Sequence, residues 1–174
     1  PGINKQKIPP LNLYRDQALQ SDLLPAVNPS NIENGLKYKY YEADSYSSLP
    51  SFDDLKPVKT GTVADFYIFP ANRATRFSFN FTGYIDVPAD GQYTFYTTSD
   101  DGSELYIDGI LVVNNDGIQA ATEKSGTVGL KAGKHAISVG YFQQDGDKVL
   151  SLSYAGPGIN KQKIPPLNLY RDQA

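Results

Sequence analysis

The residues of this chain that are best suited to chemistry are two adjacent aspartates, Asp100 and Asp101, in the stretch Thr97–Gly109. Neighbouring carboxylates repel each other unless a cation lies between them, and oxygen ligands of this kind favour a hard ion, calcium first. The alternative interpretation is a solvated Asp-Asp-Gly turn without an ion. A second acidic pair, Asp53-Asp54, could simply cap a short helical turn, so an Asp-Asp pair does not by itself identify a metal site.

A loop nearer the C-terminus offers further oxygen donors. Its sequence is Gln-Gln-Asp-Gly-Asp, and it contributes the side chains of Gln143, Gln144, Asp145 and Asp147. Loops gather at the two ends of a β-sandwich, and this loop and the one containing the aspartate pair follow strands that end in a similar sense. We therefore expect the two loops to meet and to supply about six to eight oxygens, with backbone carbonyls and water included. The alternative is an ordinary hairpin turn, which is favoured for Gln144 and for Asp147 taken separately.

Other kinds of catalytic or metal site have little support. The chain has no Cys and a single His, which excludes disulfides, Cys-based zinc sites, cysteine nucleophiles and a histidine cluster. His135 follows a Lys-Ala-Gly turn, and we expect it on the surface. Nucleophile-elbow, dinucleotide-binding and P-loop patterns are missing, and the acidic residues fall in turns, where solvent keeps them ionised, unlike a glycosidase acid. The sequence predicts a protein that is not an enzyme.

Composition limits the possible partners. The chain has 174 residues, 40% of them apolar, with 13 Tyr and 8 Phe, which is enough for one domain with a real core. Its net charge is −3 and it has no basic block, so nucleic acid and anionic membranes are poor partners. No apolar run approaches the ~20 residues of a membrane span, so no membrane insertion is expected. No signal peptide begins the chain, and we expect it to start within a longer precursor.

The pattern of apolar residues predicts an all-β fold. The clearest run is Arg76–Val87, in which Phe and branched residues alternate with polar ones, as in a half-buried antiparallel strand. Asp108-Gly109 predicts a hairpin turn between two short strands in Glu104–Val113. About eight to ten short strands without helical periodicity indicate an antiparallel β-sandwich with few or no helices. The other predicted strands are Leu36–Glu42, Thr62–Phe69, Gly91–Thr97, Thr127–Leu130, Lys134–Phe142 and Lys148–Tyr154.

The two ends of the chain carry the same sequence. Pro1–Ala18 recurs without a change as Pro157–Ala174, and a repeat over a domain-sized distance indicates a tandem array of near-identical domains. A cloning duplication is the alternative. We expect residues 1–18 to be the tail of a preceding repeat, 19–34 a linker with a helical turn near Gln20–Leu24, 35–156 the sandwich, and 157–174 its own tail. Two Pro-containing breaks predict an extended tail that packs across its own sandwich or bridges to the next unit.

Several blocks of sequence together resemble the protective-antigen-type lectin-like β-sandwich, the "PA-fourteen" domain. They are LKYKYYE, FTGYIDVPADGQYTFYTT, SDDGSELYIDGILVV, KAGKHAISVGYF and LSLSYAGPGI, together with the C-terminal block PGINKQKIPPLNLY. The resemblance covers about Gly35 to Tyr170. It implies a lectin-like fold of the kind used in bacterial adhesins, glycosidases, toxins and yeast flocculation proteins, where it is usually an accessory module.

In the sugar-binding branch of this family, two aspartates joined by a cis peptide ligate one calcium ion, and the ion chelates two hydroxyls of a terminal sugar. The resemblance places Asp100 and Asp101 in this role. It implies that the loop before the last strands completes the site, with side chains of Gln143 and Asp145 and a backbone carbonyl of Gly146 or Asp147. The predicted sugar contacts are Asp100, Asp101, Gln144, Asp145 and Gly146. The aromatic or Arg side chain that flanks the sugar in some members has no counterpart in this loop.

The resemblance and the repeat together predict a calcium-dependent carbohydrate-binding repeat of a secreted or surface-anchored bacterial adhesin. Its expected partners are cell-surface glycans or polysaccharides with terminal sugars, and the neighbouring repeats of the same chain. Weak single sites in an array gain avidity by about 10²–10⁴ through multivalency. Two alternatives stay open: a structural spacer or protein-interaction repeat without sugar binding, and an accessory module of a secreted glycosidase.

Overall fold

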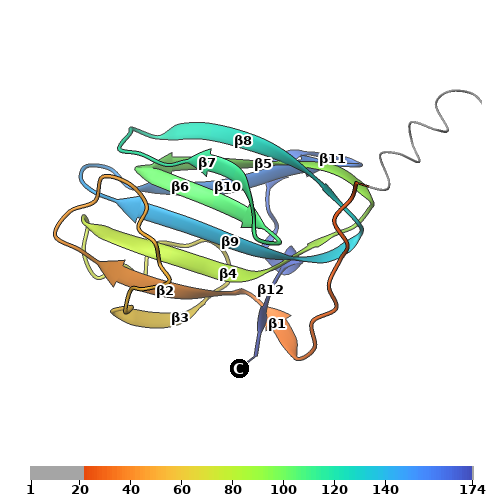
Figure 1. Ribbon diagram of the computed structural model, residues 1–174, viewed down its shortest axis with the longest axis horizontal. Helices are drawn as coiled ribbons and strands as arrows, with labels where there is room; N and C mark the ends of the chain where they lie inside the picture. The colour runs from red at the N-terminus through yellow and green to blue at the C-terminus, as the bar shows by residue number, and fades with distance from the viewer. Residues whose placement is uncertain (1–21, 174) are drawn as a thin grey trace, which may run out of the picture.

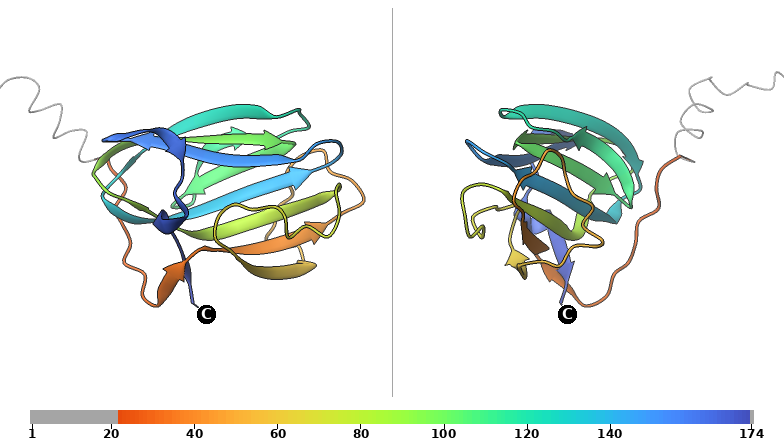
Figure 2. Two further views of the ribbon diagram at one scale, coloured as in Figure 1. Left: turned by 180° about the vertical axis from the view of Figure 1, so that it is seen from behind. Right: turned by 60° about the vertical axis from the view of Figure 1, so that its left-hand side comes forward.

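The protein is an antiparallel β-sandwich. The computed structural model describes residues 22–173, and the expectations for Pro1–Ala18 and for the start of the helical turn near Gln20 lie outside the described residues. Two sheets pack face to face (Figures 1 and 2). The elements are β1 (Ile32–Asn34), β2 (Leu36–Glu42), β3 (Lys59–Val63), β4 (Phe77–Val87), β5 (Gly91–Asp100), β6 (Gly102–Ile107), β7 (Ile110–Asn115), β8 (Thr122–Leu130), β9 (Gly133–Gln143), β10 (Val149–Gly156), β11 (Ile159–Lys163), the 3₁₀ turn η1 (Pro166–Asn168) and β12 (Leu169–Asp172).

The strand order explains how distant segments come together. The eight-stranded sheet runs β1-β12-β4-β9-β6-β7, with β2 also paired to β4 and β3 added at the edge of β2. The four-stranded sheet runs β11-β10-β5-β8. Since β5 lies in one sheet and β6 in the other, the chain crosses between the sheets at the aspartate pair.

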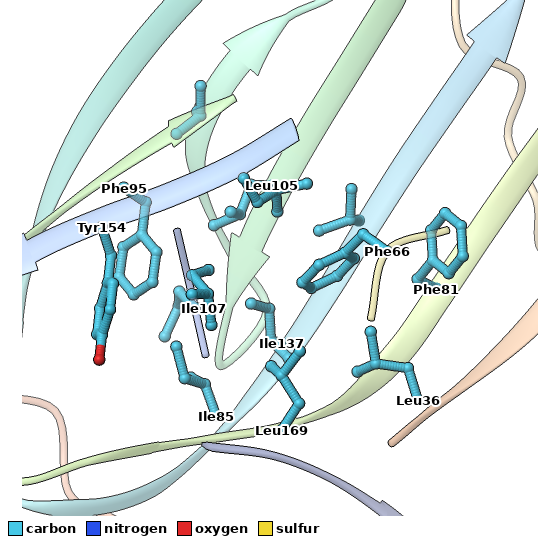
Figure 3. Packing of buried hydrophobic residues seen from close by; sticks show 14 of the residues in the cluster. Leu36, Phe66, Phe81, Ile85, Phe95, Leu105, Ile107, Ile137, Tyr154 and Leu169 are labelled. Atoms are coloured by element: carbon cyan, nitrogen blue, oxygen red, sulfur yellow. The ribbon is translucent and has the colours of Figure 1, made fainter. Parts of the chain in front are cut away.

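The core fills the space between the two sheets (Figure 3). Along β4 the predicted alternation is confirmed: the Phe and branched side chains of the inward face are at most 1% exposed. Burying a large apolar side chain of this kind contributes about 1.5–3 kcal/mol, so the alternation of β4 fixes its register against β9. The inward residues of β4 are Phe77, Phe79, Phe81, Ile85 and Val87.

The predicted strands are confirmed with shifted ends, except for one. Thr62–Phe69 is wrong as a strand, because β3 covers Lys59–Val63 and the chain then leaves the sheet. Phe66 turns into the core, where its ring meets that of Phe81 edge-on at 5.7 Å, while the Phe69 side chain is exposed. The aromatic residues after β3 therefore follow core packing and not a strand ladder.

His135 is also placed differently from the prediction of a surface position. Its side chain is fully buried, because it lies opposite the inward-facing Ile85 in the β4–β9 pairing. The ring Nδ1 is 2.7 Å from Oδ2 of Asp108, and Nε2 is 2.8 Å from the backbone oxygen of Lys131. His135 therefore joins the β6–β7 turn to the β8–β9 turn at the end of the sandwich opposite the aspartate pair.

The segment before β2 runs along the domain. Leu24 forms an isolated bridge with Leu130, Val27 forms one with Lys134, and β1 pairs with β12. The end of the predicted linker thus contributes backbone hydrogen bonds to the sandwich.

The C-terminal tail packs across its own sandwich. This was one of its two predicted placements, the other being a bridge to the next unit. Strand β11 extends the four-stranded sheet beside β10, and β12 inserts between β1 and β4 in the other sheet. Between them Ile164 is buried, and Leu169 is completely buried at the start of β12. The tail thus closes the sandwich by contributing to both sheets.

Replacing Leu169 by Ala should destabilise the protein strongly. Its side chain is 0% exposed, and removing a buried Leu costs about 2–5 kcal/mol. Leu167→Ala is the matched control, because Leu167 is 75% exposed and surface changes stay within about 0.5 kcal/mol. The free energy of unfolding, measured in urea, distinguishes the two variants. Equal values for the two would contradict the described packing of the tail.

Candidate functional site

Three loops meet around the aspartate pair at one end of the sandwich, on the left in Figure 1. They are the β5–β6 turn, the β7–β8 loop of residues 116–121, and the β9–β10 loop of residues 144–148. They meet there because β5, β7 and β9 all run toward this end, as their antiparallel pairings with β8, β6 and β4 require. The two loops that were expected to share an end do so.

The Asp101 carboxylate joins these loops. It is only 3% exposed. Its Oδ1 accepts a hydrogen bond of 3.1 Å from the backbone N–H of Gln119, and its Oδ2 accepts one of 2.7 Å from that of Gln144. A carboxylate that accepts from backbone N–H groups forms charge-assisted bonds, which are stronger than neutral ones. Asp101 therefore fixes the β7–β8 and β9–β10 loops relative to the β5–β6 turn.

Asp100 lies at the end of β5 and is joined to Asp101 by a cis peptide bond. Burial, followed by the charges of Asp101 and Asp147, raises the pKa of the Asp100 carboxyl above its ordinary value, while a hydrogen bond from the Ala121 N–H acts against this rise. Negative charge thus gathers here from two of the loops. In residues 22–173 no Lys, Arg or His forms an ion pair with these carboxylates.

Tyr141 links the aspartates to the predicted carboxamide ligand. Its hydroxyl donates to the backbone oxygen of Asp100 at 2.5 Å and also lies 3.2 Å from Oε1 of Gln143. Burial, and after it the charges of Asp100 and Asp101, raises the pKa of the Tyr141 phenol. The Gln143 side chain is fully buried, and its Nε2 donates to the backbone oxygen of Gly146 at 3.2 Å. Gln143 is therefore linked to Asp100 through the Tyr141 hydroxyl, and Gly146 is linked through Gln143.

The remaining predicted site residues lie in the same β9–β10 loop. The side chain of Gln144 is used internally: its Oε1 accepts from the Tyr46 N–H at 2.5 Å, and its Nε2 donates to Oδ2 of Asp145 at 3.1 Å. Asp147 is exposed and close enough to Asp100 to influence its pKa. Gly146 has a positive φ of 82° and open space where a side chain would begin. The structure thus gives Gln144 a positioning part within the loop.

Two polar residues next to the aspartate pair, Asn115 and Gln119, were not predicted as part of the site. Asn115 is fully buried and donates to backbone oxygens of Thr97 and Thr122 at 3.2 and 2.8 Å. Gln119 Nε2 donates in turn to Oδ1 of Asn115 at 2.8 Å and to the backbone oxygen of Asp101 at 3.3 Å. The signal available in the sequence was the turn cluster Asn-Asn-Asp-Gly before Gln119, which places a third polar loop two strands after the aspartates.

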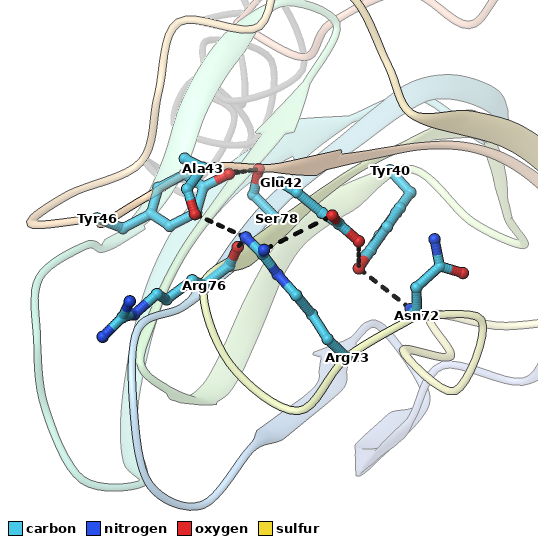
Figure 4. Close-up of polar contacts among 8 residues, drawn as sticks. All are labelled: Tyr40, Glu42, Ala43, Tyr46, Asn72, Arg73, Arg76 and Ser78. Carbon is cyan, nitrogen blue, oxygen red and sulfur yellow. Dashed lines mark hydrogen bonds and ion pairs between the residues drawn. The ribbon is translucent and has the colours of Figure 1, made fainter.

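A second polar network holds the neighbouring loops (Figure 4). The Arg73 guanidinium donates to the backbone oxygen of Ala43 at 2.6 Å and to that of Arg76, and it lies 3.6 Å from a Glu42 carboxylate oxygen. The Arg76 N–H donates to the backbone oxygen of Gln144 at 3.1 Å. This network therefore connects the loops that follow β2 and β3 to the candidate site.

The donors of this site suit calcium in kind. They are carboxylate, carboxamide and backbone oxygens, and calcium takes about six to eight such ligands. No group of three or more His, Cys, Asp or Glu side chains in residues 22–173 is arranged to hold a metal. An ion here would therefore depend on the two aspartates together with Gln143 and backbone carbonyls.

Comparisons with known proteins point to one domain family. A family model described as the PA14 domain matches residues 33–168. The anti-sigma-I factor RsgI3 of Acetivibrio thermocellus is 35% identical over 95 residues, which are 54% of this chain and 15% of that protein. The solved PA14 domain of the MpAFP antifreeze protein has a TM-score of 0.68 at 19% identity, covering 85% of this chain and 96% of that one.

A second solved structure, a PA14 sugar-binding domain from an RTX adhesin, has a TM-score of 0.62 at 18% identity and covers 79% of this chain and 98% of that one. At these identities the two structures establish the shared fold. The curated anti-sigma factor is much longer than the part this chain matches. Within the described residues, none of the helical segments has the length and apolarity to cross a bilayer.

The raised pKa of Asp100 predicts how an Asp100→Asn variant depends on pH. A raised pKa means that the folded protein binds this proton more tightly than the unfolded chain, so this carboxyl lowers stability as pH rises through its folded pKa. Without metal, Asp100→Asn should therefore raise the melting temperature at neutral pH, and the difference should disappear in acid. Thermal unfolding followed by circular dichroism across pH measures this, with Asp54→Asn in the exposed second acidic pair as the control. A variant less stable than wild type at neutral pH would contradict the assigned charge cluster.

Proposed function

This chain belongs to the PA14 domain family, and we propose that it is a calcium-dependent carbohydrate-binding domain of an extracellular adhesin. The observation that carries the proposal is the Asp101 carboxylate, which holds two loops beside Asp100 by accepting the N–H groups of Gln119 and Gln144. The Tyr141 hydroxyl lies within hydrogen-bond distance of both the backbone oxygen of Asp100 and Oε1 of Gln143. The solved relative described as a sugar-binding domain from an adhesin supports the same conclusion.

The residues that would hold the ion are Asp100, Asp101 and Gln143, with a backbone carbonyl of Gly146 or Asp147. The charges of Asp101 and Asp147 disfavour the ionised form of Asp100 in the metal-free protein, so binding of a cation offsets this repulsion. When bound, calcium supplies open coordination positions that two neighbouring sugar hydroxyls can fill.

The loop residues would orient the sugar. Asp100 and Asp145 carry carboxylate oxygens that can accept hydrogen bonds from sugar hydroxyls, and such charge-assisted bonds are the stronger kind. The Gln144 side chain is held by the Tyr46 N–H and by Asp145, so we assign it the role of fixing Asp145 in place. Gly146 leaves open space above the loop, through which a terminal sugar ring can approach.

Calcium should stabilise the wild-type protein. A ligand that binds only the folded state at about 100 times its Kd adds about 2.7 kcal/mol to the free energy of unfolding. Asp100→Asn should lose this gain because it removes a ligand without removing the bonds that Asp101 makes to the loops. Asp54→Asn should keep the full gain. Urea unfolding with calcium and with a chelator measures it, and an equal gain in Asp100→Asn would place the ion elsewhere.

Glycan binding should require calcium. We expect the full chain to bind glycans with terminal vicinal hydroxyls on an array, to lose them when EGTA is added, and to regain them when calcium is restored. The second candidate function, a structural spacer, is favoured by the duplicated segment Pro157–Ala174, because its residues 159–172 contribute β11 and β12 to the two sheets. A folded domain that binds no array glycan in calcium would support the spacer and refute the lectin function.

A further inference from the structure

One cavity in residues 22–173 lies away from the aspartate site. It has a volume of about 670 Å³ and is formed on the outer face of the eight-stranded sheet, and neither Asp100 nor Asp101 lines it. Its size falls within the range of about 300–1,000 Å³ that is typical of ligand pockets. We refer to this cavity as the outer-sheet groove.

The register of three strands gives the groove its floor and walls. The floor is the outward face of the central strand β9, where Ala136, Ser138 and Gly140 are all small. Opposite Ala136 stands Tyr84 of β4, and opposite Ser138 stands Tyr106 of β6. Because these two tyrosines are much larger than the floor residues between them, they form opposite walls of a trough along β9.

A loop closes one end of the groove. Gly140 is buried because residues 49–53 lie over it, and a Cβ built at Gly140 would be 3.1 Å from the Phe52 ring and 3.3 Å from Leu49. The N–H of Leu49 donates to Oδ1 of Asp116 at 2.8 Å, which fixes the loop. At the other end Ala136 is exposed, so the trough opens to solvent there.

The groups that line the groove suit a neutral, hydroxyl-rich ligand. Each wall tyrosine has a carboxylate beside its hydroxyl: Tyr106 donates to Glu104 at 2.8 Å and Tyr84 to Asp172 at 3.3 Å. Cationic and amide side chains also line the groove, namely Lys37, Arg171 and Asn80. With both signs of charge present, a polyanion and a polycation would each meet like charges, whereas hydroxyl groups can donate to the carboxylates and accept from the cations.

The strand pairing beneath the groove makes an extended peptide a poor ligand. A peptide that binds a sheet usually adds a strand at a free edge, but β9 is paired on both sides, with β4 and β6. The groove therefore offers no free backbone ladder along its floor. It offers half-buried tyrosine rings, which combine an apolar face with a polar end.

We propose that the outer-sheet groove binds a neutral oligosaccharide chain at a site separate from Asp100 and Asp101. The tyrosines contact sugar rings from both sides, and Glu104, Asn80 and Asp172 receive hydroxyl hydrogen bonds. No metal takes part in this binding.

The test is an NMR titration of the isotope-labelled full chain in EGTA, with neutral hexasaccharides such as cellohexaose, xylohexaose and agarohexaose as probes. Working in EGTA separates this site from the calcium-dependent one, so either proposal can fail alone. At least one probe should shift the amide signals of Ala136, Ser138 and Tyr106 in a saturable manner while those of Gln119 and Gln144 stay in place. If no probe in the panel shifts the groove signals, the proposal is wrong.

Variants provide a second readout. Tyr106→Ala should weaken binding about tenfold or more, which corresponds to about 1.4 kcal/mol, and Ser138→Tyr should block the trough by filling its floor. Tyr67→Ala is the matched control, because Tyr67 is exposed and does not line the groove. Equal affinity in Ser138→Tyr and wild type would overturn the proposal. The probe titration with wild type stands on its own if Ser138→Tyr fails to fold.

Discussion

The site end of this sandwich depends on one buried carboxylate. Asp101 accepts backbone N–H groups from two loops that are far apart in sequence, at Gln119 and Gln144, and so ties three connections together where the chain crosses between sheets. Removing a buried acceptor of this kind lowers the free energy of unfolding, because each N–H left unpaired costs about 1–3 kcal/mol. The arrangement of the candidate ligands therefore follows from the same bonds that hold the loops.

The loop end and the outer-sheet groove offer different chemistry. At the loop end, the carboxylates form no ion pair with a Lys, Arg or His among the described residues, and burial together with neighbouring charge raises the pKa of Asp100. The outer-sheet groove, on the outer face of the eight-stranded sheet, is lined by charges of both signs and by two tyrosine rings. The first arrangement suits a cation with a few sugar hydroxyls, and the second suits several sugar units in a row. A domain with both would hold the end of a glycan and the middle of a chain in separate places.

Much of the fold could be predicted because its strands alternate. The inward Phe and Ile residues of β4 were identified from period alone, and the Asp108-Gly109 hairpin from its turn residues. Phe66 and His135 were not, because their positions depend on which partner strand faces them and on core packing, information that a single sequence does not contain. The meeting of the aspartates with the loop after Gln143 was predictable from how sandwich loops gather. Gln119 and Tyr141 were not, since each acts through a backbone oxygen or N–H whose place is set only by the finished fold.

We propose that one calcium ion binds where Asp101 joins the loops. An NMR-detected calcium titration of the full chain, which follows the amide signals of Gln119 and Gln144, is the decisive measurement. We expect both signals to move together in one saturable event of one ion per chain, and the Ala136 signal in the outer-sheet groove to stay still. If neither amide signal moves at saturating calcium, or if the shifts centre on another part of the sandwich, the ion does not bind at this site.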